Sequence, residues 1–85
     1  MLHELKTWPE YFQPVKAGVK TFEGRVDDRN FQIGDRLLLR EWDPKLKHYT
    51  GRKLTCEITY KMPGGQFGIS PSWCVLAIRV VDAPR

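Results

Sequence analysis

The chain has 85 residues, the length of one small domain, and we expect a single domain over residues 1–85. Its composition, 41% hydrophobic and 28% charged, excludes a disordered tail and favours a packed core. The net charge of +4 is compatible with a polyanionic partner such as RNA or a nucleotide. No apolar run approaches the roughly 20 residues of a membrane helix, and the N-terminal residues lack the apolar core of a secretion signal. We therefore expect no membrane partner and a cytoplasmic location.

The N-terminal part of the chain predicts a short strand followed by a helix. Residues 2–6 alternate loosely between apolar and polar side chains, as in a strand. Thr7 and Glu10 have the spacing of a capping box, which predicts a helix start. The helix is expected to end at Gly18, and Pro14 predicts either a bent helix or two short turns that meet near Gln13. Four residues at helical spacing predict its buried stripe: Trp8, Tyr11, Phe12 and Val15.

The strand predicted over residues 20–26 carries the densest group of polar residues in the chain. Phe22 is expected to anchor one face of this strand in the core. Thr21, Glu23 and Arg25 then project together from the other face. Glu23 and Arg25 can pair, which would fix the guanidinium for a planar or anionic ligand. The alternative is a solvated ion pair at the edge of a sheet.

The rest of the chain predicts three more strands, over residues 37–42, 54–60 and 73–81. The last of them is an almost unbroken apolar run, so we assign Trp73 to the core. Cys56 and Cys74 lie in apolar stretches and are expected to be buried, reduced thiols. One early helix beside five short strands predicts an α+β, mainly β fold, in which a helix closes one end of a small barrel or folded sheet.

A second candidate site is the basic loop predicted over residues 45–53. Lys47 and Arg52 are among its four basic residues, which can neutralise phosphates. Tyr49 can stack on a base, and the preceding Trp42 could add a second aromatic plane. The alternative is a mobile, solvated hairpin loop.

The sequence contains no strong catalytic motif. A phosphate-binding P-loop, a dinucleotide-binding glycine motif and an H-E-x-x-H zinc motif are all missing. His3 and His48 lie in different predicted elements, and no carboxylate spacing accompanies them. We therefore expect neither a metal nor a cofactor.

Two strings, Trp8-Pro9-Glu10-Tyr11-Phe12 and the pattern G-x-K-T-x-E-x-R over residues 18–25, precede a Gly34-Asp35 pair. Together they resemble a family of small bacterial and phage proteins of unknown function, which is similar to the ASCH domains of the PUA-like superfamily. The match runs from about Leu5 to Val80. The resemblance implies a PUA-like, five-stranded pseudobarrel with an N-terminal helix beside it. It also implies a cleft between helix and sheet, lined by Lys20, Thr21, Glu23 and Arg25.

The resemblance also implies a function, because members of the superfamily bind RNA or nucleotides. Some ASCH proteins are small hydrolases that deacylate a modified cytidine with a lysine, a threonine and a glutamate. Lys20 matches the lysine, whereas the position of the nucleophilic threonine falls near Glu23. In this alternative Lys20 would be the base for Thr21 or for water, with Glu23 or Glu57 as the acid.

We therefore predict an RNA- or nucleotide-binding module rather than an enzyme, with a cationic cleft and aromatic stacking. Its binding is expected to weaken as the salt concentration rises. A third hypothesis is a protein-interaction role, such as a small inhibitor encoded by a phage or mobile element. The predicted binding residues are Lys20, Thr21, Glu23, Arg25, Arg29, Trp42, Lys47, Tyr49 and Arg52.

Overall fold

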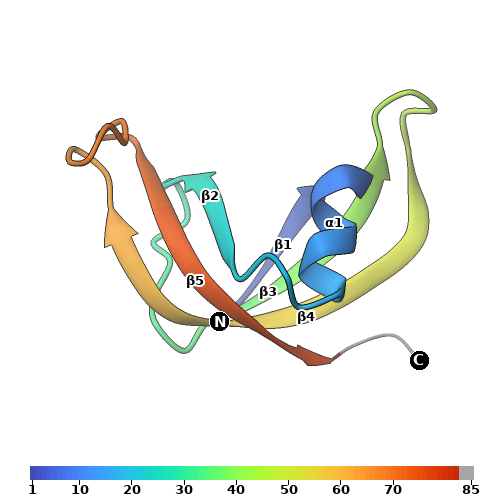
Figure 1. The fold of residues 1–85 in the computed structure, drawn as a ribbon, viewed down its shortest axis with the longest axis horizontal. Helices are drawn as coiled ribbons and strands as arrows, with labels where there is room; N and C mark the ends of the chain where they lie inside the picture. The colour runs from blue at the N-terminus through green and yellow to red at the C-terminus, as the bar shows by residue number, and fades with distance from the viewer. Residues whose placement is uncertain (83–85) are drawn as a thin grey trace.

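In the computed structural model, which describes residues 1–82, five strands form one strongly curled sheet beside a single short helix (Figure 1). This confirms the α+β, mainly β class. The elements in chain order are β1 (Leu2–Thr7), α1 (Pro9–Lys16), β2 (Phe22–Val26), β3 (Arg36–Asp43), β4 (His48–Pro63) and β5 (Trp73–Asp82). Within residues 1–82, no helix has the length and apolar character needed to cross a membrane.

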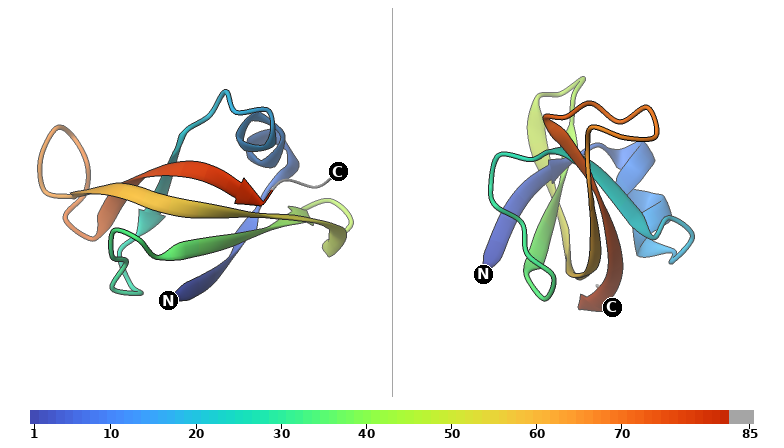
Figure 2. Two further views of the ribbon diagram at one scale, coloured as in Figure 1. Left: turned by 90° about the horizontal axis from the view of Figure 1, so that it is seen from below. Right: turned by 90° about the vertical axis from the view of Figure 1, so that its left-hand side faces the viewer.

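The strand order across the sheet is β1-β3-β4-β5-β2, so that β1 and β2 are the two edges. β1 runs parallel to β3, and the other three pairs are antiparallel. The 16-residue β4 shifts register against β5 near Cys56 and again between Ile58 and Tyr60. Such bulges increase bending and twist, and β4 sweeps in a curve from one end of the molecule to the other (Figures 1 and 2).

The curl brings the edge strands β1 and β2 towards each other, and arginine side chains from the β2 region bridge them. Arg25 Nη2 donates to the backbone oxygen of Lys6 at 2.6 Å. Arg29 Nη1 donates to the backbone oxygen of Glu4 at 2.8 Å. We call this junction the seam. It is spanned by side chains, whereas the neighbouring strands of the sheet are joined by backbone ladders.

The core fills the space between α1 and the sheet. Phe12 and Val15 enter it from the helix. Cys56 and Cys74 are buried and unpaired, as expected, and burial raises the pKa of Cys56 to about 11 and raises that of Cys74. The remaining core residues are Leu5, Phe31, Leu37, Leu39, Leu54, Ile58, Leu76 and Ile78.

The helix start differs from the predicted capping box. Thr7 is the last residue of β1, and Trp8 is the N-cap, without a side-chain cap hydrogen bond. The alternation of β1 turns Thr7 inward together with His3 and Leu5, so its hydroxyl cannot cap the helix. Two residues of the predicted stripe are about half exposed rather than buried: Trp8 and Tyr11.

The two faces of β2 are the reverse of the prediction. Phe22 is 53% exposed, whereas Glu23 is buried. The side chains of β2 alternate as predicted, but the face that carries Glu23 and Arg25 lies inside. Trp73 is 44% exposed rather than a core residue, and Tyr60 turns outward after the register shift in β4.

The predicted basic loop is largely strand. β4 begins at His48, so the connection between β3 and β4 is a short turn over residues 44–47. Trp42 pairs with Tyr49, and Asp43 with His48, across the two strands. We call this end of the molecule the β3–β4 hairpin.

Candidate functional site

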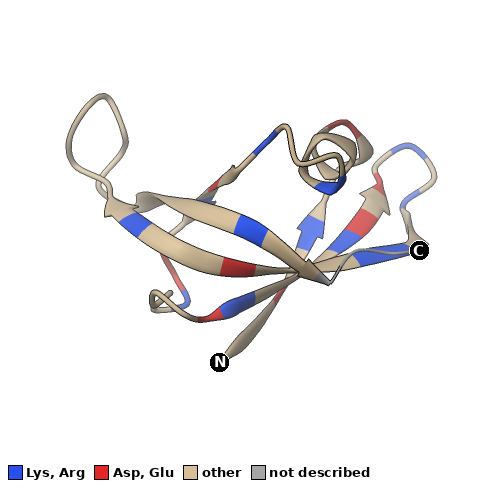
Figure 3. Ribbon diagram, turned by 60° about the horizontal axis from the view of Figure 1, so that its bottom comes forward, with Lys and Arg blue, Asp and Glu red and all other residues tan. Residues whose placement is uncertain are grey.

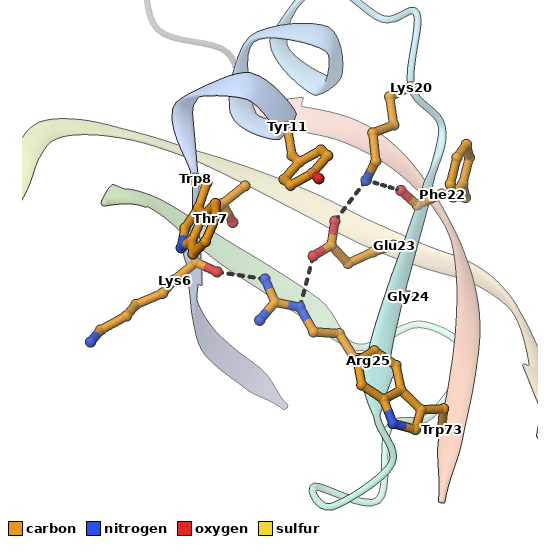
Figure 4. A pocket seen from close by; sticks show the side chains of 10 residues that line it. All are labelled: Lys6, Thr7, Trp8, Tyr11, Lys20, Phe22, Glu23, Gly24, Arg25 and Trp73. Atoms are coloured by element: carbon orange, nitrogen blue, oxygen red, sulfur yellow. Dashed lines mark hydrogen bonds and ion pairs between the residues drawn. The ribbon is translucent and has the colours of Figure 1, made fainter. Parts of the chain in front are cut away.

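A cleft of about 470 Å³ opens where the end of β1 and the start of α1 face β2 (Figure 4). Its volume lies within the roughly 300–1,000 Å³ typical of small-ligand sites. Lys20, Glu23 and Arg25 are among its lining residues, whereas Thr21 is not. The cleft therefore brings together three of the four residues that the family resemblance placed there.

These three residues form one connected network, which we call the charged triad. Glu23 Oε1 accepts from Lys20 Nζ at 3.0 Å, and Oε2 accepts from Arg25 Nε at 2.7 Å. Lys20 Nζ also donates to the backbone oxygen of Phe22 at 2.6 Å, and Arg25 Nη2 donates to that of Lys6. The Glu23 side chain is only 7% exposed, so its carboxylate is a fixed element of the cleft wall.

Local structure explains why the triad assembles. Glu23 and Arg25 are two residues apart on β2 and so point to the same face of the strand. Lys20, just before the strand, reaches the other carboxylate oxygen. Lys20 uses two of its three N–H donors here and Arg25 two of its five, which leaves donors available to a ligand.

Four exposed aromatic side chains surround the triad, and we call them the rim: Trp8, Tyr11, Phe22 and Trp73. Their exposed fractions lie between 44% and 53%. They come from four different segments, namely the β1–α1 junction, α1, β2 and the start of β5. Half-exposed aromatic rings beside a charged floor provide apolar planes for a planar ligand.

Thr7 is a cleft residue that the sequence analysis missed. It is 3% exposed and lines the cleft, and its Oγ1 has no hydrogen-bond partner among the described residues. Buried polar side-chain atoms nearly always have a partner, so the Thr7 hydroxyl is an exception at the wall of the cleft. Extending the alternation of residues 2–6 by one step would have placed Thr7 on the inner face of β1.

The aromatic residues predicted at the hairpin lie elsewhere and are already covered. Trp42 and Tyr49 pack edge to face with ring centroids 5.0 Å apart. Lys6 Nζ lies 4.0 Å from the Trp42 ring, and Arg40 Cζ lies 3.7 Å from the Tyr49 ring. Each ring therefore has a cation of the same chain over one face.

Arg52 and Lys47 do not reach the cleft. Arg52 Nη2 donates to Gln13 Oε1 at 2.7 Å and its guanidinium lies 5.0 Å from the Phe12 ring, so it ties α1 to β4. Lys47 is exposed in the hairpin turn. In Figure 1, α1 stands between this hairpin and β2.

The remaining residues predicted from the sequence do not line the cleft. Thr21 is exposed, and Arg29 lines a neighbouring cavity along the seam. Glu57, the alternative acid, forms an ion pair with Arg79 Nη2 at 2.7 Å outside the cleft. Figure 3 shows basic residues on several strands and on the hairpin rather than gathered at one place. Within residues 1–82, no three His, Cys, Asp or Glu side chains are grouped as metal ligands.

Residues 2–78 match the model of the family described as Domain of unknown function (DUF3850). The chain belongs to this family. An uncharacterized 12.9 kDa protein from the GpA 3' region of Escherichia phage P2 is 43% identical to it over 58 residues. That alignment covers 68% of this chain and 51% of the phage protein, so the chain spans about half the length of this curated relative. The expected small family of unknown function with phage members is thus confirmed.

A solved structure has the same fold. The crystal structure of hypothetical protein PH0355 aligns with a TM-score of 0.69 at 19% sequence identity. The alignment covers 95% of this chain and 100% of that one. The curled five-stranded sheet with its helix is therefore shared by a protein of low sequence similarity.

Proposed function

We propose that this domain binds a nucleotide, free or within single-stranded RNA, in the cleft between α1 and β2. The observation that carries the proposal is the buried carboxylate of Glu23, held by Lys20 and Arg25 inside a rim of four exposed aromatic rings. We also propose that the curled sheet is a PUA-like pseudobarrel of the ASCH type, and that the protein acts in the cytoplasm, where these ligands occur.

Stacking on the aromatic rings and hydrogen bonding to the edge of the base are the two main contributions to the binding free energy. A base stacked on an aromatic side chain contributes about 1–3 kcal/mol. A nucleobase edge carries both donors and acceptors. Glu23 can accept from an amino or ring N–H group, while Lys20 and Arg25 can donate to a carbonyl, a ring nitrogen or a phosphate. Because the triad is already hydrogen-bonded, little reorganisation is needed for a single base to bind in the cleft.

Electrostatic attraction is the smaller contribution. Glu23 offsets one of the two cations, so the triad carries a formal charge of +1. The remaining basic residues are spread over the molecule (Figure 3). The cleft therefore favours recognition of one base with its attached phosphate over tracking of a long polyanion.

The contacts of the triad favour binding over the hydrolase alternative. The base of that alternative, Lys20, has its Nζ held by the Phe22 backbone oxygen and by Glu23 Oε1, rather than hydrogen-bonded to the hydroxyl of a nucleophile. Thr21, the nucleophile of that alternative, does not line the cleft.

The test is calorimetric titration of the wild-type protein with the four ribonucleoside monophosphates and short single-stranded RNA at low salt. We expect saturable binding, quenching of tryptophan fluorescence from the rim, and loss of binding in Glu23→Gln. Glu57→Gln is the matched control, because it removes the same charge from an ion pair outside the cleft. If none of these ligands binds, and lysate capture yields a stoichiometric protein instead, the proposal fails in favour of protein interaction.

A further inference from the structure

A second cavity of about 300 Å³ adjoins the cleft along the seam. Gly24, Arg25 and Trp73 line both cavities. Leu5 and Phe31 form apolar walls of the second cavity, and Arg29 adds a second guanidinium. The two cavities therefore share one wall.

The shared wall is the Arg25 side chain. It extends from β2 across the seam to the backbone oxygen of Lys6 (Figure 4), and it lines both cavities. Arg29 crosses the same seam to Glu4, two residues earlier on β1. Because side chains rather than a backbone ladder span the seam, rotation of Arg25 would join the cavities into one groove.

Gly24 keeps the middle of this groove open. It lies within β2, and its backbone does not adopt a positive φ that would require glycine. A Cβ atom placed there would meet no other atom within 4 Å. Glycine inside a strand usually weakens it and often marks a close approach by a ligand or another backbone.

The lining of the second cavity is suited to a nucleotide that is linked through a phosphate to the base in the cleft. Planar guanidinium groups bind phosphate through paired N–H donors. The opposing charge, Asp28, is weakly engaged, with its carboxylate 3.8 Å from Arg29 Nε. Arg25 and Arg29 reach β1 carbonyls two residues apart, a separation of about 7 Å that resembles the step between phosphates of an extended strand.

We propose that the seam is a two-subsite groove for single-stranded nucleic acid. One base occupies the cleft, the linking phosphate lies against Arg25 and Arg29, and the adjacent nucleotide occupies the second cavity beside Trp73. This inference rests on the proposed function and names its ligand: a strand of at least two nucleotides rather than a free mononucleotide.

The test compares a mononucleotide with the dinucleotide and tetranucleotide of the same base, by calorimetry at one low salt concentration. The dinucleotide should bind about 10-fold tighter, the effect of one added charge-assisted contact. Arg29→Gln should remove this gain and leave unchanged the binding of the unphosphorylated nucleoside, which lacks the group that Arg29 contacts. Arg36→Gln, which removes the same charge from β3 outside both cavities, should change neither affinity.

Asp28→Asn provides a second variant with the opposite sign and little risk to folding, since Asp28 is exposed. It should raise dinucleotide affinity about twofold, the effect of removing one solvent-exposed charge of the same sign as the phosphate, without changing the affinity for the unphosphorylated nucleoside. If the mononucleotide binds, but the dinucleotide binds no tighter or keeps its advantage in Arg29→Gln, the second subsite is refuted while the proposed function stands. If no nucleotide or oligonucleotide binds, the proposed function itself fails.

Discussion

The cleft and the β3–β4 hairpin contain the same ingredients in different arrangements. Each has aromatic rings, cations and a buried glutamate, which is Glu23 in the cleft and Glu41 at the hairpin. Glu41 Oε1 accepts from Thr50 Oγ1 at 2.7 Å, with Arg52 Nε 3.6 Å away. At the hairpin, the rings of Trp42 and Tyr49 are covered by cations of the chain.

In the cleft, the rings are less covered. Lys20 lies 4.8 Å from the Phe22 ring, but among the described contacts no cation lies over Trp8, Tyr11 or Trp73. Aromatic and basic residues that are close together in sequence therefore do not by themselves indicate a ligand site. A ring is useful for stacking only where its face is free.

Strand pairing explains the difference. The hairpin is a continuous ladder, and the register of β1 against β3 places Lys6 opposite Arg40, next to the two rings. The cleft lies at the seam, where β1 and β2 have no neighbouring strand on that side. Within residues 1–82, no further strand supplies a row of side chains to cover the rim.

Removal of Glu23 from the cleft or of Glu41 from the hairpin should cause the greatest change in stability and binding. Glu23→Ala should lower the free energy of unfolding by about 2–3 kcal/mol, because it leaves two partly buried cations without their acceptor. Glu41→Ala should also destabilise the fold, but only Glu23→Ala should abolish nucleotide binding. Urea denaturation and calorimetry measure the two effects. Equal loss of binding in both variants would erase the distinction between the regions.

Removing an uncovered ring of the rim should have a different effect from removing a covered ring of the hairpin. Trp73→Ala should weaken oligonucleotide binding about 10-fold, which corresponds to about 1.4 kcal/mol of lost stacking. Trp42→Ala should leave binding unchanged and reduce stability instead, because it removes the contacts with Lys6 and Tyr49. Fluorescence anisotropy with a labelled oligonucleotide tests both. A stronger binding defect in Trp42→Ala would move the site to the hairpin.

Salt dependence offers a smaller but independent measure. If one or two phosphates are neutralised at the seam, affinity should fall less than about 10-fold between 50 and 200 mM salt. Engagement of all four basic residues at the hairpin would instead give a fall of about 50-fold. A titration series at four salt concentrations distinguishes the two slopes, and the steeper one would contradict a seam site.

The smallest effect concerns acid stability of the hairpin turn. The Asp43 carboxylate accepts from the backbone N–H groups of Leu46 and Lys45, which lowers its pKa below the ordinary value of 3.8. A lowered pKa stabilises the fold above pH 4, and this stabilisation is lost as the pH falls below that value. The protection factor of the Leu46 amide, which corrects for the intrinsic pH dependence of exchange, should therefore fall on acidification, and less so in Asp43→Asn. An equal fall in the variant would assign the effect to another group.

The pKa of a second carboxylate, Asp35, is also lowered, so its effect on acid stability must be distinguished from that of Asp43. The pKa of Asp35 is lowered to about 2, chiefly by its hydrogen bond with His3, against the opposing effect of burial. Its contribution to stability is present above pH 3.8 and is lost as the pH falls towards 2. Global unfolding of Asp35→Asn against pH, compared with the local exchange at Leu46, distinguishes the two groups.

Several features could be predicted because they depend on near neighbours in the chain. Two-residue alternation located the strands, and the spacing of Glu23 and Arg25 placed their side chains on one face. Several predictions that failed concern which face is inside, and another failed because the loop predicted over residues 45–53 is largely strand. Phe22, Trp73 and Thr7 each satisfied a local rule that the curled sheet overrode.

Patterns along the chain predicted the order of the elements, the type of most of them, the Glu23–Arg25 pair and the lack of a strong catalytic motif. The inward polar face of β2, the contact of Lys20 with Glu23, the covered hairpin rings and the two arginines across the seam became visible only in the folded chain. The reason is physical: alternation relates residues two positions apart, but it does not say which face meets the core. That choice depends on contacts between β1 and β2, segments about 20 residues apart in the chain and joined only when the sheet curls.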